Sequence, residues 1–280
     1  MQFIKGQHFS NLSSTSDDVD IFFMKTEYVN DFFKNCNKNK KFILISHTSD
    51  ALVTYNPRQY NTMSADLHAN ANLIPENCIK WFSSMIDCIH DKIVPLPLGI
   101  ENNFNFENFI NNNYQNIEKR TDKLLFVNFK ISNNYPERIE AFNSVFDRDF
   151  VTITDSMFTS EQLSVPTNPF PYVKKMTNDE FWIQIKSHDF VLCPTGNGPD
   201  SHRLWETLYL GSIPIVRRRD NYLLYENKLP ILFVDNYSEI NKELLQLKKI
   251  EIQYKILNNQ YDINMLNFEY WEKKIKSELI

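Results

Sequence analysis

Residues 194–206 read PTGNGPDSHRLWE and combine glycine, arginine and glutamate at a spacing that suits a nucleotide. Gly196 and Gly198 belong to a chain with only five glycines, which indicates a loop that needs unusual backbone angles or close approach by a ligand. Arg203 supplies a guanidinium that can hold a phosphate through two hydrogen bonds. Glu206 follows one helical turn later, and its carboxylate can accept hydrogen bonds from two ribose hydroxyls. The segment predicts a binding site for a nucleotide diphosphate.

The elements around this segment would form a βαβ unit. The apolar run 189–193 predicts a buried strand, and the turn-forming residues 194–200 predict a loop. A helix would follow from about residue 201 to 210, and the apolar run 213–216 predicts a second, parallel strand. The start of the helix would present free backbone N–H groups and a partial positive charge, which favour a bound anion.

A plainer interpretation is open from these residues alone. A glycine loop before a helix is often only a tight turn, and Arg203 and Glu206 could form a surface ion pair of little energetic value. The longer string CPTGNGPDSHRLWETLYLGSIPIV, residues 193–216, adds more specific information. It closely resembles the C-terminal signature of exostosin-like glycosyltransferases, which runs roughly Cys-Pro-x-Gly-x-Gly-x-Asp-x-x-Arg-x-Trp-Glu-x-Leu-x-x-Gly-x-Ile-Pro-Ile-Val.

The resemblance implies an α/β fold of the GT-B type, with two Rossmann-like domains that face each other across a cleft. We expect an acceptor-side domain at residues 1–115, a donor-binding domain at 116–262, and a C-terminal helix at 263–280 that packs back on the N-terminal domain. In such an enzyme Glu206 would bind the donor's ribose. The residues expected to bind the donor are Arg138, Thr195, Gly196, Asn197, Gly198, Asp200, Ser201, His202, Arg203 and Glu206.

Other elements of the second domain follow from local signals. Residues 123–128 predict its first strand, and Pro136 begins a helix that carries Arg138 in its first turn, on the same rim as the glycine loop. A salt bridge of Arg138 with a neighbouring glutamate is the alternative. Residues 177–180 form a capping box, and Ser238 is expected to cap a later helix.

The N-terminal domain offers candidates for a general base. The apolar run 41–46 predicts a strand, and it ends in Ser46-His47-Thr48-Ser49-Asp50, where the carboxyl end of a parallel strand places ligand-binding residues. We expect Asp50 to take the proton from the acceptor hydroxyl, with His47 and Asp66 as further candidates. Alternatively, Asp50 caps a helix, His47 is a core histidine, and Asp66 is a solvated loop residue.

Neither of two Asp-x-Asp sequences looks like a metal site. Residues 18–20 and 147–149 precede apolar runs, whereas the metal-binding motif of the other glycosyltransferase architecture follows a strand. We therefore expect no metal and no cofactor, with the helix N-terminus and the arginines stabilising the leaving diphosphate. The resemblance implies an inverting transfer.

The resemblance also implies a UDP-sugar donor and a glycan acceptor. The sugar could be glucuronic acid, N-acetylglucosamine, galactose, arabinose or xylose. A short stand-alone chain of this kind is similar to soluble exostosin-like enzymes of large DNA viruses and some bacteria. Among these we favour a viral xylosyltransferase that builds a capsid glycan, and UDP-xylose as donor.

Composition narrows the other possibilities. A net charge of −5 argues against a nucleic-acid partner, whose binding surface would be basic. No apolar run approaches the length of about 18 residues that a membrane span needs, and the N-terminus lacks a signal-peptide core. The four cysteines show no metal-type spacing and are expected to be reduced thiols. We therefore expect a cytoplasmic protein, in the host cytoplasm if it is viral.

Two other functions fit part of the sequence. GNGPDS imitates the GxGxxG fingerprint, and Arg217–Arg219 would suit the 2′-phosphate of NADP, so an NADP-dependent oxidoreductase is an alternative. Against it, Ser201 replaces the third glycine, and Glu206 has no purpose there. A non-catalytic carbohydrate-binding module is the other alternative, although it would not need a diphosphate site.

Overall fold

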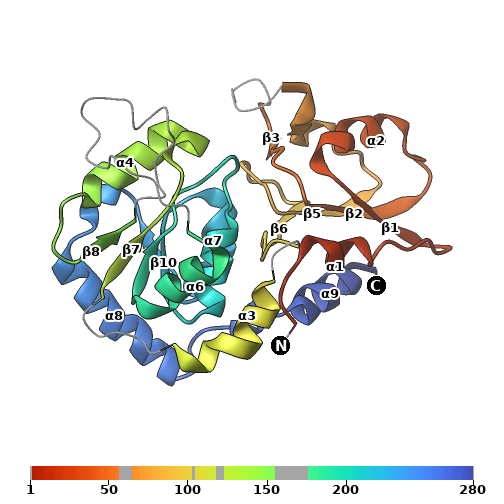
Figure 1. Cartoon of the computed structure of the whole chain (residues 1–280). Helices are drawn as coiled ribbons and strands as arrows, with labels where there is room; N and C mark the ends of the chain where they lie inside the picture. The colour runs from red at the N-terminus through yellow and green to blue at the C-terminus, as the bar shows by residue number, and fades with distance from the viewer. Residues whose placement is uncertain (1, 57–64, 103–104, 118–122, 155–175, 280) are drawn as a thin grey trace.

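The computed structural model describes residues 2–56, 65–102, 105–117, 123–154 and 176–279, and it contains two parallel sheets placed side by side (Figure 1). The N-terminal sheet has the strand order β1-β2-β5-β6, and the C-terminal sheet has the order β11-β10-β9-β7-β8. All neighbouring strands in both sheets are parallel. The strands are β1 Val19–Met24, β2 Lys41–Ser46, β5 Cys78–Ser83, β6 Ile93–Pro95, β7 Leu125–Val127, β8 Val151–Ile153, β9 Phe190–Leu192, β10 Ile213–Arg217 and β11 Leu232–Val234.

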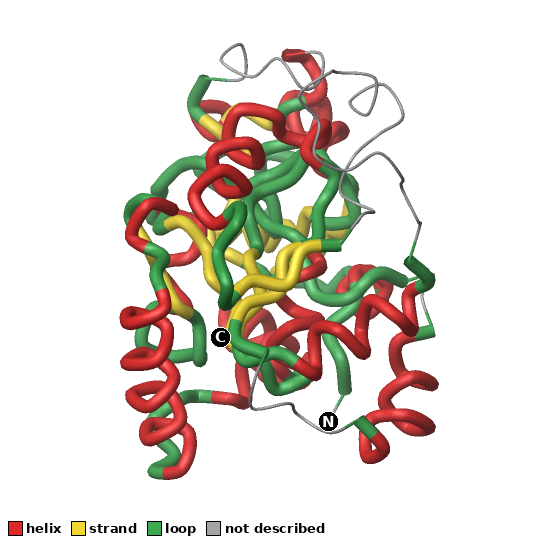
Figure 2. Tube along the Cα trace, turned by 60° about the vertical axis from the view of Figure 1, so that its left-hand side comes forward, coloured by secondary structure: helices red, strands yellow, loops and turns green. Residues whose placement is uncertain are grey.

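Helices surround the strands, which lie in the interior of the molecule (Figure 2). A further short parallel pair, β3 Val53–Thr54 and β4 Ala69–Asn70, flanks the N-terminal sheet. No helix in the described part of the chain has both the length and the apolarity to cross a lipid bilayer. The α-helices are α1 Gly6–Ser10, α2 Val29–Asn35, α3 Phe106–Asn113, α4 Tyr135–Val145, α6 Asn178–Ser187, α7 His202–Tyr209, α8 Lys242–Leu257 and α9 Phe268–Lys276.

The C-terminal sheet is buried on both faces, which explains the uninterrupted apolar runs of its strands. In β9, Phe190 and Leu192 belong to a core cluster with α4 and α8. The intervening Val191 belongs to a different cluster with α6 and α7. Residues of one strand thus alternate between two helical layers, as the period of a strand requires.

The N-terminal sheet shares one of these clusters. Ile43 and Ile45 of β2 lie in the same continuous core as Trp205 of α7, whereas Leu44 packs in a separate cluster with α2. One hydrophobic core therefore runs from the N-terminal sheet into the C-terminal half. This continuity fixes the position of α7 between the two sheets.

The C-terminal helix returns to the N-terminal half. α9 lies next to α1 beneath the N-terminal sheet (Figure 1). Phe268 donates its backbone N–H to the carbonyl of Gln2 at 3.0 Å, and its ring meets that of Phe9 edge-on at 5.2 Å. Trp271 is fully buried, and its indole N–H donates to the Met265 carbonyl at 2.9 Å.

Local signals placed most helix starts correctly but missed one. Thr177 and Glu180 form the expected reciprocal capping box at α6. Ser238, however, lies in a 3-10 turn, and the prediction that it caps the long helix was wrong. α8 begins at Lys242, and its cap is Asn241, whose side chain accepts the Leu244 N–H. Ser238 and Asn241 are both residue types that cap helices well. The 3-10 turn at residues 237–239 contains Ser238, so the helix begins after Asn241 instead.

Candidate functional site

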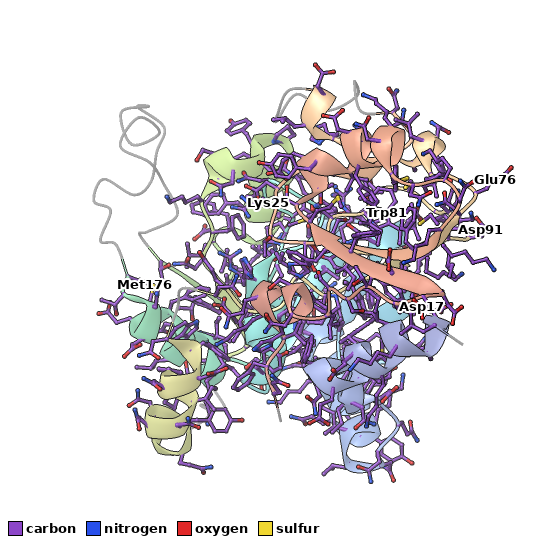
Figure 3. All side chains as sticks on the ribbon, turned by 90° about the vertical axis from the view of Figure 1, so that its right-hand side faces the viewer. Asp17, Lys25, Glu76, Trp81, Asp91 and Met176 are labelled. Atoms are coloured by element: carbon purple, nitrogen blue, oxygen red, sulfur yellow. The ribbon has the colours of Figure 1, made fainter. Side chains whose placement is uncertain are left out.

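Three cavities meet along the 194–203 segment. The largest, about 530 Å³, lies between the two halves and is called here the cleft cavity. A second, about 490 Å³, lies against the start of α7 and is called the α7 cavity. A third, about 400 Å³, lies on the other side of the glycine loop and is called the loop cavity. Lys25, an exposed residue that lines the cleft cavity, lies near the middle of the view in Figure 3, whereas Glu76 and Asp91 lie at its edge.

The α7 cavity brings together the side chains with the most specific predicted roles. Arg138 of α4 and Arg203, Glu206 and Ser201 from the start of α7 all line it. Glu206 is 5% exposed, and one carboxylate oxygen accepts the Trp182 indole N–H at 3.0 Å. Burial raises the pKa of Glu206, an effect opposed by the Trp182 hydrogen bond and by the positive charge of Arg203. The other carboxylate oxygen accepts no hydrogen bond from the described residues and is available for a ligand.

Two guanidinium groups line this cavity together, that of the buried Arg138 and that of the half-buried Arg203. Arg138 donates from Nε to the Thr195 carbonyl at 2.8 Å and from a terminal nitrogen to the Lys130 carbonyl at 2.6 Å. Burial, followed by the charge of Arg203, lowers the pKa of Arg138 to about 9. Arg203 Nε and the Ser201 hydroxyl are buried and lack a hydrogen-bond partner in the part of the chain that the structure describes. An anion bound here would relieve the repulsion and satisfy these donors.

Three amides of the segment 195–201 already have acceptors within the protein. The Thr195 N–H donates to Glu137 at 3.3 Å, the Gly196 N–H to the Gly198 carbonyl at 3.2 Å, and the Ser201 N–H to Asp200 at 2.7 Å. Residues 195–198 line the loop cavity or the cleft cavity and not the α7 cavity. Near the α7 cavity, the first amides of α7 and the side chains around them can serve as donors to an anion. Donor binding by Thr195 and Gly196 stays a prediction.

Asp200 is committed to the protein. Its carboxylate, 4% exposed, accepts the Leu98 N–H at 2.9 Å, the Trp205 indole N–H at 2.9 Å and the Tyr222 hydroxyl at 3.2 Å. Burial raises the pKa of Asp200 to about 6 despite these donors. Because Leu98 follows β6, this carboxylate joins the N-terminal half to the start of α7. The structure thus places Asp200 as a group that positions α7, where donor binding had been predicted.

His202 makes a second link between the same two segments. Its ring Nδ1 lies 2.7 Å from the Gly99 carbonyl and must donate to it, because a carbonyl only accepts. That bond leaves Nε2 as an acceptor when the ring is neutral. His202 lines both the α7 cavity and the cleft cavity.

Asp50 lies in the cleft cavity, as a general base would. It is exposed and accepts a hydrogen bond from the Asn197 side-chain amide at 3.2 Å. Asp50 follows the carboxyl end of β2 in the N-terminal half, and Asn197 belongs to the glycine loop of the C-terminal half. The carboxylate therefore faces the opposite wall of the cleft.

The two further candidates for a base do not fit that role. His47 is 1% exposed; its Nε2 donates to the Pro97 carbonyl at 3.1 Å, and its Nδ1 accepts the Thr48 N–H at 2.8 Å. Both ring nitrogens are thus occupied, and burial lowers the pKa of His47 to about 4. Asp66 is an exposed residue of a 3-10 turn and lines none of the three cavities. His47 corresponds to the core histidine, and Asp66 to the solvated residue.

Two carboxylates in the cleft were missed from the sequence. Glu27 lines the cleft cavity and accepts the Ser49 hydroxyl. Glu101 lines both the cleft cavity and the α7 cavity. The available signal for Glu101 was its place just after β6, at the carboxyl edge of the sheet. Among the described residues, no group of three or more His, Cys, Asp or Glu side chains is arranged to hold a metal ion.

The arginine triplet is not placed for a nucleotide 2′-phosphate. Arg217 pairs with Glu140, Arg218 with Asp235 at 3.0 Å and with Glu226, and Arg219 with Glu137. None of the three arginines lines the α7 cavity. This arrangement disfavours the oxidoreductase alternative.

Comparison with known proteins agrees with this architecture. Residues 155–280, less than half of the chain, match the family model described as RXYLT1 C-terminal domain. No curated protein matches. The solved OtsA apo structure aligns with a TM-score of 0.54 and 11% identity over 98% of this chain and 75% of that one. The fold is GT-B.

A second GT-B structure was solved with a ligand. It is described as trehalose-6-phosphate from E. coli bound with UDP-2-fluoro glucose, and it aligns with a TM-score of 0.50 and 10% identity. The alignment covers 98% of this chain and 75% of that one. At such identities the likeness establishes the GT-B fold and leaves the chemistry to the residues of this chain.

The buried state of His47 predicts a loss of stability in mild acid. The unfolded chain protonates His47 near pH 6.5 and the folded chain near pH 4, so the unfolded state binds more protons between these values. The free energy of unfolding should therefore fall as the pH decreases. Between pH 7 and pH 5 the His47 contribution is about 2 kcal/mol.

Urea unfolding followed by tryptophan fluorescence at both pH values measures this loss. His47→Gln, which keeps one donor and one acceptor, should lose about 2 kcal/mol less over the same range. Equal losses in the two proteins would show that His47 titrates normally.

The close approach of Gly196 to Arg138 allows a steric test of the role of Arg138. A Cβ at position 196 would lie 2.8 Å from a terminal nitrogen of Arg138, so Gly196→Ala must displace that guanidinium. We expect UDP affinity, measured by calorimetry, to fall by at least about fivefold. Gly198→Ala is the matched control, because its Cβ would press on the flexible Met85 side chain, away from the α7 cavity. Equal effects of the two variants would contradict the role of Arg138.

Proposed function

We propose that the protein is a glycosyltransferase that moves a sugar from a UDP-sugar, with UDP-xylose preferred, to a hydroxyl of a glycan acceptor. The observation that carries this proposal is the α7 cavity. A buried carboxylate, one buried and one half-buried guanidinium group and a helix N-terminus line one cavity, with an unpartnered guanidinium nitrogen and hydroxyl among the described residues. This set matches a ribose joined to a diphosphate.

In this proposal Glu206 accepts hydrogen bonds from the ribose hydroxyls. The diphosphate lies at the start of α7, where Ser201, Arg203 and Arg138 supply donors. The two positive charges and the helix N-terminus also stabilise the charge that develops on the leaving UDP. We therefore propose a reaction that needs no metal.

The acceptor would occupy the cleft cavity, which adjoins the α7 cavity. Both cavities are lined by Ser201 and His202, so a sugar attached to the diphosphate can reach the cleft. Asp50 would take the proton from the acceptor hydroxyl as that oxygen attacks the anomeric carbon. The new bond forms on the face opposite the departing UDP, and the sugar's configuration inverts.

The domain assignment follows the same division. We propose that residues 1–115 bind the acceptor, that residues 116–262 bind the donor, and that residues 263–280 join the latter to the former. The neighbour bound with UDP-2-fluoro glucose and the match to the RXYLT1 C-terminal domain support a UDP-sugar donor. A binding module would have little use for Arg138 and Arg203 at this cavity.

A ligand panel tests the proposal directly. Calorimetry with UDP, GDP, CMP and NADPH should show micromolar binding of UDP alone. UDP-xylose should bind as well, and slow release of xylose from it should reveal catalysis. Binding of NADPH without UDP would overturn the proposal, and binding without turnover over a broad acceptor panel would favour the carbohydrate-binding module.

Glu206→Ala should weaken UDP binding by about tenfold to a hundredfold, the range expected when hydrogen bonds to a charged group are lost. The effect should depend on the ribose. The wild-type protein should bind 2′-deoxy-UDP more weakly than UDP, whereas Glu206→Ala should bind the two equally. A variant that still discriminates between them would remove Glu206 from the ribose site.

Asp50→Asn should lower the rate of transfer by about 10² to 10⁴, because the amide cannot accept the proton. Its affinity for UDP should be unchanged, since Asp50 lies outside the α7 cavity. Asp66→Asn is the control, and its rate should equal that of the wild type. Near-normal transfer by Asp50→Asn would place the base elsewhere.

A further inference from the structure

We propose that the donor sugar is neutral and that Glu101 makes the site reject a uronic acid. This inference rests on the proposed function and concerns which UDP-sugars the same site accepts. It depends on where the two cavities join and on how charge is divided between them.

The junction of the cavities locates the donor sugar. With the ribose at Glu206 and the diphosphate at the start of α7, the sugar continues from the diphosphate toward the cleft. The residues that line both cavities mark this passage, and they are Glu101, Asn133, Ser201 and His202. Glu101 is the carboxylate of this set, and no lysine or arginine of the described chain belongs to it.

Charge changes sign across this junction. The α7 cavity is lined by Lys130, Arg138 and Arg203 together with two carboxylates, so it suits a diphosphate. The cleft cavity contains Lys25 as its cation among the described residues. Its acidic lining residues are Glu27, Asp50, Glu101 and Asp200.

The charge of Glu101 acts on Glu206 inside the α7 cavity. It acts to raise the pKa of Glu206, although burial is the largest cause of that shift. The negative charge of Glu101 disfavours ionisation of Glu206. It would also repel the carboxylate of a uronic acid at the junction of the two cavities. No lysine or arginine at the junction, among the described residues, would offset that repulsion.

Two of the four groups at the junction, Glu101 and His202, favour a neutral sugar. Glu101 is an acceptor when ionised, and His202 presents Nε2 as an acceptor when its ring is neutral, because Nδ1 donates to Gly99. Sugar hydroxyls can donate to both. A uronate carboxylate has only acceptor oxygens, so it cannot bond to either group.

The test compares two donors that differ only at C6 of the sugar, UDP-glucose and UDP-glucuronic acid, with UDP and UDP-xylose alongside. Calorimetry should show UDP-glucuronic acid binding at least about tenfold more weakly than UDP-glucose. Glu101→Gln removes the charge at nearly constant size and should bring the two affinities within about threefold of each other. UDP affinity should persist in this variant, which reports that the site is intact.

Glu27→Gln is the matched control. It removes a carboxylate of the cleft cavity that does not line the α7 cavity, so the ratio between the two donors should stay at its wild-type value. Equal binding of both donors by the wild-type protein would overturn the inference, as would an unchanged ratio in Glu101→Gln. Failure of the wild-type protein to bind UDP would instead overturn the proposed function.

Discussion

The site depends on the carboxylate of Asp200, which holds the start of α7 against the N-terminal half. A buried carboxylate is costly unless hydrogen bonds satisfy it, and here Leu98, Trp205 and Tyr222 each contribute a donor. One of these donors belongs to the loop after β6, and the other two belong to the C-terminal half. The bond from His202 to Gly99 lies beside this link. Together they fix the end of α7 at which the three cavities meet.

The cleft therefore has two chemically different compartments separated by one helix terminus. Lys130, Arg138 and Arg203 gather with a helix N-terminus in the α7 cavity, and the burial of Arg138 strengthens its effect on an anion. Carboxylates predominate in the cleft cavity, where hydroxyl groups would have to donate and be deprotonated. A single cavity of uniform charge would favour either the binding of an anion or the deprotonation of a hydroxyl group, and it would disfavour the other.

The sequence was most informative where the signal is local. The βαβ unit around residues 189–216 was predictable because each strand is a short apolar run, buried on both faces, and the helix between them has clear ends. The capping box at Thr177 is equally local. The helical spacing alone places Glu206 beside Arg203. The position of Arg138 at the same site was predictable because its helix follows the carboxyl end of the strand predicted at residues 123–128.

The remaining features depend on contacts between distant residues. Nothing near Asp200 in the sequence reveals that the Leu98 N–H will occupy its carboxylate. His47 looked like a base because it follows a strand, but its Nε2 donates a hydrogen bond to the Pro97 carbonyl and burial keeps the ring neutral. Local sequence also does not reveal that Glu137 accepts the Thr195 N–H or that the Gly198 carbonyl accepts the Gly196 N–H. Glu101 gains its position only when the two halves meet.

The link between α7 and the loop after β6 has a consequence for motion between the two halves. A hinge motion that separated them would have to break the Leu98 and Gly99 bonds and rehydrate a buried carboxylate. Rotation of single side chains takes picoseconds to nanoseconds and leaves this link intact, whereas domain motion takes microseconds to milliseconds and would disrupt it. Opening of the cleft would therefore be coupled to hydration of the start of α7.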